Sequence, residues 1–133
     1  MFHPETANLG GQYLDDADTE LSHGHQHQHI ELVTLDSLDL RRPVSFVKMD
    51  VEGAEPQVVA GARQLLSEDR PLILCELHAG QMDKVAGVSP SEFVVDVTSL
   101  GYRCHRIAPG GELGAEFDIN EDVHVLNVAF VPA

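Results

Sequence analysis

Two short segments, residues 44–51 and 72–77, are apolar on both faces and flank a stretch with helical spacing. Strands that are hydrophobic on both faces are typical of parallel sheets covered by helices. The intervening stretch has Pro56 at its expected first helical position, where a missing N–H is tolerated, and its apolar residues recur at helical intervals. This strand–helix–strand alternation predicts parallel pairing through right-handed crossovers, and therefore an α/β fold.

The rest of the chain continues the alternation with clear boundaries. Residues 89–92 form a capping box with proline at the first helical position, and Gly101 stands where a C′ glycine would end that helix. Residues 102–107 and 123–131 predict two strands, which we expect to pair antiparallel because no helix joins them. A short apolar stretch at residues 30–35 predicts a further strand.

The first 29 residues differ in composition from residues 30–133, which form the expected domain. The N-terminal segment is polar, carries an acidic run at residues 15–20 and has alternating histidines at residues 23–29. We interpret it as a loop or a loosely packed hairpin. On a strand the histidines would share one face and could offer imidazole ligands to a metal. A solvated loop is the commoner structure of such a tract, and we predict no metal site.

Charge and hydropathy limit the partners and the compartment. The formal net charge is −14, which disfavours binding to nucleic acid or to an anionic membrane surface. No apolar run approaches the roughly 20 residues that span a bilayer, and the N-terminus lacks a signal-peptide pattern. Cys75 and Cys104 fall within predicted strands and are expected to be buried free thiols. We therefore expect a cytoplasmic protein that acts on a small molecule.

Polar residues follow both of the doubly apolar strands. Asp50, Glu52 and Glu55 come after the first, and Glu76 and His78 come after the second. Ligands of open α/β sheets bind beyond the carboxyl ends of strands, so we expect these five residues at one rim. A carboxylate or imidazole there can act as a general base toward a hydroxyl. Structural roles also stay open: Glu52 and Glu55 suit a helix N-terminus, and His78 suits a loop.

Residues 46–56, FVKMDVEGAEP, strongly resemble the central signature of the FkbM-type methyltransferases, a hydrophobic strand ending in Lys-Ile-Asp-Val-Glu-Gly-x-Glu. Residues 34–38 and 61–78 are similar to the family's flanking segments, and residues 8–14 are similar to a glycine-containing stretch that precedes them. The resemblance implies a Rossmann-like class I methyltransferase sheet, of which this chain would supply the C-terminal half. It also implies S-adenosylmethionine as cofactor, a hydroxyl of a small natural product or sugar as acceptor, and active-site positions for the acidic residues of the signature.

The sequence has no counterpart of the glycine-rich cofactor loop on the family's first strands. Neither the glycine pairs at 10–11 and 110–111 nor Gly53 has the expected context of a cofactor loop. We therefore expect the cofactor-loop strands to be absent, and the sequence does not predict cofactor binding by the chain alone. The free edge of the 44–51 strand would then be covered by residues 1–35, by a second copy or by a separate N-terminal polypeptide. Two functions remain: a truncated or split O-methyltransferase, and a non-catalytic binding or dimerisation module with a degenerate methyltransferase fold.

Overall fold

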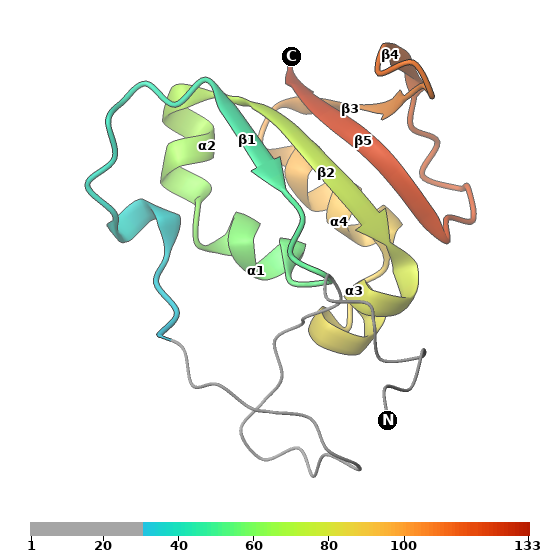
Figure 1. Cartoon of the computed structure of the whole chain (residues 1–133), viewed down its shortest axis with the longest axis horizontal. Coiled ribbons are helices and arrows are strands. Elements are labelled where there is room, and N and C mark those ends of the chain that lie inside the picture. Colours follow the sequence, from blue (N-terminus) through green and yellow to red (C-terminus); the bar gives the residue numbers. More distant parts are fainter. Residues whose placement is uncertain (1–30) are drawn as a thin grey trace, which may run out of the picture.

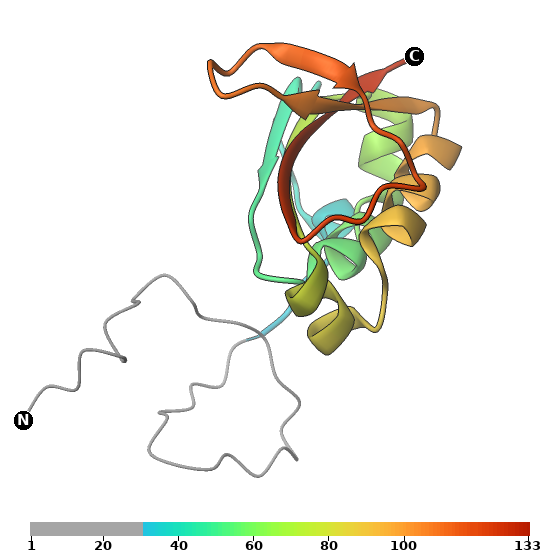
Figure 2. The same ribbon diagram turned by 90° about the vertical axis from the view of Figure 1, so that its right-hand side faces the viewer.

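The computed structural model describes residues 31–133, which form a five-stranded sheet with helices on one of its faces (Figure 1, Figure 2). The strands are, in chain order, β1 (Phe46–Met49), β2 (Leu72–His78), β3 (Tyr102–Ile107), β4 (Leu113–Glu116) and β5 (Val125–Pro132). Their order across the sheet is β1-β2-β5-β3-β4. The β1–β2 pair is parallel, and the three other neighbouring pairs are antiparallel. The fold is therefore mixed α/β with a mostly antiparallel sheet.

The strand pairings expected from the sequence are present, and the structure adds the central position of β5. Parallel pairing of β1 with β2 is confirmed, with Phe46 opposite Leu72 and Met49 opposite Cys75. The expected antiparallel pairing of β5 with β3 is also confirmed, and β5 pairs with β2 on its other side, so it lies between β2 and β3. Its central place is explained by three successive apolar residues, 128–130, which are all buried. A sheet centre buries such a run better than an edge does.

The helix expected to begin at Pro56 is divided into α1 (Glu55–Ala60) and α2 (Arg63–Asp69). The segment before β1 accounts for the division. There, Leu35–Ser37 forms a 3-10 helix (η2) in place of the end of the expected strand. The carboxylate of Asp36 in η2 accepts hydrogen bonds of 2.9 Å from two backbone amides in the first turn of α2. Because Asp36 caps α2 from outside, this helix starts independently of α1.

Two helices connect β2 to β3: α3 (Ala79–Ala86), which the sequence did not predict, and α4 (Pro90–Ser99). The predicted capping box of α4 is confirmed. The Ser89 hydroxyl accepts from the Glu92 amide at 3.2 Å, and the Glu92 carboxylate accepts from the Ser89 amide at 2.8 Å. Gly101 follows the helix with a φ of +86°, as expected of a C′ glycine. Within residues 31–133, no helix has the length and apolarity needed to cross a membrane.

Removing this cap provides a test of how α4 is anchored. Ser89→Ala is expected to lower the free energy of unfolding by about 1 kcal/mol, because the Glu92 amide loses its partner and the Glu92 carboxylate loses the bond from the Ser89 hydroxyl. Urea denaturation of the full chain would measure the loss. The matched control is Ser99→Ala in the last turn, which removes an exposed serine whose hydroxyl bonds only to the Asp96 carbonyl. Equal losses in the two variants would contradict the assignment of the cap.

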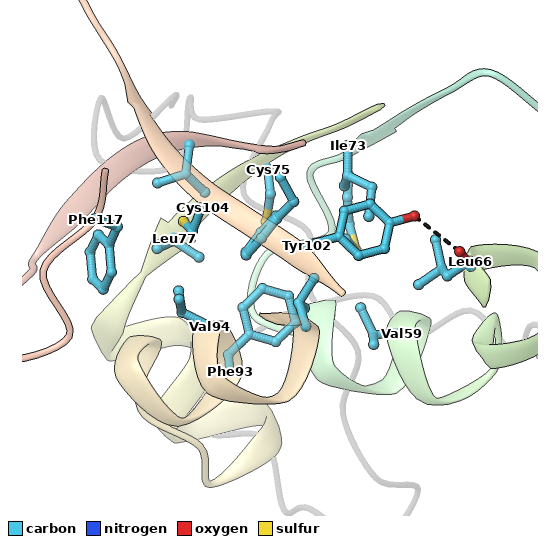
Figure 3. Packing of buried hydrophobic residues seen from close by; sticks show 14 of the residues in the cluster. Val59, Leu66, Ile73, Cys75, Leu77, Phe93, Val94, Tyr102, Cys104 and Phe117 are labelled. Atoms are coloured by element: carbon cyan, nitrogen blue, oxygen red, sulfur yellow. Dashed lines mark hydrogen bonds between the residues drawn. The ribbon is translucent and has the colours of Figure 1, made fainter. Parts of the chain in front are cut away.

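The core lies between the sheet and the α-helices α1 to α4 (Figure 3). The rings of Phe93 on α4 and Phe130 on β5 pack edge to face, with centroids 5.8 Å apart. The hydroxyl of Tyr102 donates to the Leu66 carbonyl at 3.1 Å, so its burial leaves no polar atom unpaired. The face of the sheet that carries these residues is thus fully occupied by packing.

Cys75 and Cys104 lie in this core as free thiols, which confirms the prediction made for them. Burial is the largest cause that raises the pKa of both thiols, for Cys104 to about 12. A thiol with so high a pKa stays protonated at neutral pH and is a poor nucleophile. The two cysteines are therefore structural.

An ion pair fastens the chain before β1 to the end of α2. The Arg42 guanidinium donates to both carboxylate oxygens of Asp69, at 2.8 and 2.9 Å, and the Val44 amide donates to the same carboxylate at 2.8 Å. The bond to Arg42 is the largest cause that lowers the pKa of Asp69, followed by the bond to Val44.

This pair predicts a pH-dependent stability difference. The pKa of Asp69 is lower in the folded chain than its unfolded value of about 3.9, so its contribution is complete above that value and is lost as the pH falls through the folded pKa. Asp69→Asn is expected to melt below the wild type at pH 7. The gap between the two melting temperatures should narrow as the pH falls below about 4. A gap that stays constant down to pH 2 would contradict this account.

The opposite face of the sheet, which we call the open face, has no helix over it in the part of the chain that the structure describes (Figure 2). Side chains alternate along each strand, so the neighbours of the core residues point to this face. Several of them are apolar and partly exposed: Phe46 at 49%, Leu72 at 37% and Val125 at 54%. The open face is thus more apolar than a solvated sheet face usually is.

Residues 1–30 lie outside the described part of the chain. The loop or hairpin expected for residues 1–29, the expected lack of a metal site at the histidine tract 23–29 and the domain boundary near residue 30 therefore remain predictions.

Candidate functional site

A hollow of about 520 Å³ lies where the carboxyl ends of β1, β2 and β3 meet the start of β5. Its polar lining side chains are Lys48, Asp50, Glu76 and Asn127, and the turn at residues 107–111 forms another wall. Its volume falls in the range of small-molecule sites, about 300–1,000 Å³. The hollow also occupies the rim at which ligands of open α/β sheets bind. This is the strongest candidate for a functional site among residues 31–133.

Asp50 stands directly after β1, at an exposed position of the hollow. Its carboxylate accepts a hydrogen bond of 2.7 Å from the Lys48 ammonium, and the two side chains are 49% and 65% exposed. Pairs this exposed contribute little to stability because water screens them. A ligand can therefore replace Lys48 as the partner of the Asp50 carboxylate at little cost in free energy.

Glu76 and Asn127 are direct neighbours across β2 and β5. Glu76 is half-buried and Asn127 is exposed, and neither side chain has a hydrogen bond within the described residues. A half-buried carboxylate without a partner, such as that of Glu76, favours a ligand that supplies one. The sequence argument included Glu76 but missed Asn127, although a single polar residue in the apolar stretch 125–131 is the signal that could have found it.

The connection from β1 to α1 is a tight turn. The Ala54 amide donates to the Val51 carbonyl at 3.2 Å, and the two residues between them have positive φ, +54° at Glu52 and +102° at Gly53. Positive φ at both central positions is the pattern of a type I′ turn. An alanine Cβ at Gly53 would lie 2.4 Å from the Gln81 carbonyl oxygen. Gly53 thus does lie between a strand and a helix, and the close approach of the Gln81 backbone accounts for the glycine there.

Glu55 holds this turn from the inside. Its side chain is only 2% exposed, and one carboxylate oxygen accepts from the Val51 amide at 3.1 Å. The other oxygen has no partner among the residues that the structure describes. Glu55 does not line the hollow, so its observed contacts are those of a support for the turn.

Glu52 and His78 meet at Gln81, on the first turn of α3. The Gln81 side-chain amide donates to the Glu52 carboxylate. The Nδ1 atom of His78 accepts from the Gln81 backbone amide at 3.3 Å and so caps α3. Neither Glu52 nor His78 lines the hollow. Of the five residues proposed from the sequence, the structure brings only Asp50 and Glu76 together there.

Comparison with known families gives one match. The family described as the methyltransferase FkbM domain matches residues 2–104. The comparisons found no matching curated protein and no matching solved structure. The matched region includes Asp50 and Glu76 and stops before β4 and β5, so Asn127 lies beyond it.

Proposed function

The chain belongs to the methyltransferase FkbM domain family, and from this premise we propose that it transfers a methyl group from S-adenosylmethionine to a hydroxyl of a small molecule or sugar. The observation that supports the proposal best is the hollow, which places two carboxylates of different strands at the carboxyl ends of β1 and β2.

The cofactor would supply a methyl group already activated on a sulfonium, so positioning and proton removal remain for the chain. Asp50 and Glu76 suit both tasks. A carboxylate within hydrogen-bonding reach of the acceptor hydroxyl can take its proton while the oxygen–carbon bond forms and the carbon–sulfur bond breaks. The negative charge of the pair also favours a cationic sulfonium in the same hollow. Asn127 can orient the acceptor, because its amide offers both a donor and an acceptor.

Glu52, Glu55 and His78 would act at this site through the turn and α3. Glu55 accepts a hydrogen bond from Val51 at the start of the turn, and Gln81 donates one to Glu52 within it. His78 caps the helix that carries Gln81. We propose these three residues as the support of the site, with the direct chemistry assigned to Asp50 and Glu76.

The free edge of β1 favours a partner that adds a further strand to the sheet. In the order of the sheet β1 is an end strand, and no described residue pairs with its outer edge. An unpaired edge beside a partly apolar face favours a further strand. We propose that a second copy, a separate N-terminal polypeptide or residues 1–35 supply it. The same edge is what favours the alternative function, a non-catalytic dimerisation module.

Transfer of radioactive methyl label distinguishes the two functions. The full chain would be incubated with S-adenosylmethionine labelled in its methyl group and with pools of hydroxylated small molecules and sugars. The proposal predicts label in at least one pool, in proportion to the amount of protein. A folded chain that labels no pool and binds no S-adenosylmethionine would contradict the proposal and leave the dimerisation module.

A further inference from the structure

We propose that Gln81 is a positioning residue that acts through Glu52 and thereby fixes the end of β1 beside the hollow. That the hollow is the site of methyl transfer rests on the proposed function. The contacts of Gln81 are observed within the described residues.

Gln81 contacts the turn after β1 with two different groups. Its side-chain amide donates to one carboxylate oxygen of Glu52. Its backbone carbonyl lies where a side chain at position 53 would be, 2.4 Å from an added Cβ, so only glycine fits there. One residue of α3 thus determines both central residues of the turn.

The backbone at Glu52 is in a conformation that its surroundings must hold. Its φ of +54° is in the left-handed region, which residues other than glycine, asparagine and aspartate seldom adopt. Glycine or asparagine would suit this position of a type I′ turn better. Non-glycine residues persist in such conformations where their surroundings hold them, and they cluster at functional sites. Gln81 is the group that holds this one.

Only one of the two Glu52 carboxylate oxygens has a partner among residues 31–133, and that partner is Gln81. Glu52 does not line the hollow, so Gln81 acts on the site through the turn and through Asp50, which stands two residues before Glu52 at the end of β1.

His78 extends the support to the end of β2. Its Nδ1 accepts from the Gln81 backbone amide at 3.3 Å and fixes the first turn of α3. The contacts therefore run from His78 through Gln81 to Glu52, and they connect the ends of the two parallel strands that form the hollow.

The test replaces the amide of Gln81 by a carboxylate of the same size. In Gln81→Glu the donor is lost, and two carboxylates face each other. The swapped variant E52Q/Q81E restores one amide and one carboxylate in reversed order. The matched control is Gln64→Glu, because the exposed Gln64 also donates from its side chain to a glutamate, Glu68, at 3.0 Å. Gln81→Met removes the donor without adding charge and replaces Gln81→Glu if that variant fails to fold.

Amide NMR spectra of the full chain, recorded during titration with S-adenosylmethionine, give two readouts. We expect Gln81→Glu to shift the Glu52 and Gly53 signals and to weaken cofactor binding by about tenfold or more. The E52Q/Q81E swap should return the turn signals and the cofactor affinity to near the wild-type values. Gln64→Glu should change neither the turn signals nor the affinity. Unchanged turn signals in Gln81→Glu, or a swap that restores nothing, would overturn the inference. A wild type that binds no cofactor would count against the proposed function, while the turn signals would still decide the role of Gln81.

Discussion

Replacing Gly53 by alanine is expected to lower the free energy of unfolding by about 3 kcal/mol or more. Two costs add at this position. A φ of +102° is unfavourable for any residue with a Cβ. The new Cβ would also lie 2.4 Å from the carbonyl oxygen and 2.6 Å from the carbonyl carbon of Gln81, which are backbone atoms of α3 and cannot rotate away. Urea denaturation followed by circular dichroism would measure the loss.

Gly111 is the matched control for this substitution. It has a similar φ of +85°, but an added Cβ there meets no atom within 4 Å. Gly111→Ala should therefore show only the conformational cost, about 1–2 kcal/mol. If Gly53→Ala were no less stable than Gly111→Ala, the close contact between the turn and α3 would be refuted.

Replacing Asp50 by asparagine is expected to reduce methyl transfer by about 10²- to 10⁴-fold, the usual contribution of a general base. Asparagine keeps the size of the side chain but cannot take a proton. Stability should change little, because the carboxylate is half-exposed and bonds only to Lys48. Initial rates of label transfer and the thermal midpoint would be measured on the same preparations.

Asp39→Asn controls for the change of charge. Asp39 is exposed, lies outside the hollow and takes part in none of the observed hydrogen bonds or ion pairs of the described residues. Its substitution should leave the rate near that of the wild type. A rate for Asp50→Asn within threefold of the control would remove Asp50 from the chemistry, and Glu76→Gln would then test the other carboxylate of the hollow.

Local signals made parts of the fold predictable. The start and end of α4 follow from the capping box at 89–92 and from Gly101, which act within a few residues of the chain. Strand β3 was predicted with the bounds that it has, Tyr102–Ile107. Strand β1 was also expected, although it is shorter than the apolar run. These elements have boundaries that neighbouring residues determine.

Other parts depend on contacts between distant residues. The break between α1 and α2 coincides with a cap supplied by Asp36, about 28 residues earlier in the chain. The place of β5 between β2 and β3 is a choice among sheet orders that the local pattern does not make. Helix α3 offers little signal, since Met82 is its only buried residue, and β4 is almost entirely exposed.

The same distinction between local signals and contacts of distant residues applies to the candidate site. Asp50 and Glu76 were expected at one rim because adjacent parallel strands end together, and both line the hollow. The positions of Glu52 and His78 depend on a positive φ and on the unpredicted α3, so the sequence could not distinguish support from direct contact. Asn127 was missed because the place of β5 was not known.

The central claim is that the hollow at the ends of β1 and β2 binds the reactants of methyl transfer. Titration of the labelled full chain with S-adenosylmethionine, followed by amide NMR, tests it most directly. The account predicts saturable shifts at Asp50, Glu76 and Asn127 and in the turn at 107–111, all of which line the hollow. No saturable shift in a folded chain, or shifts gathered away from these residues, would contradict it.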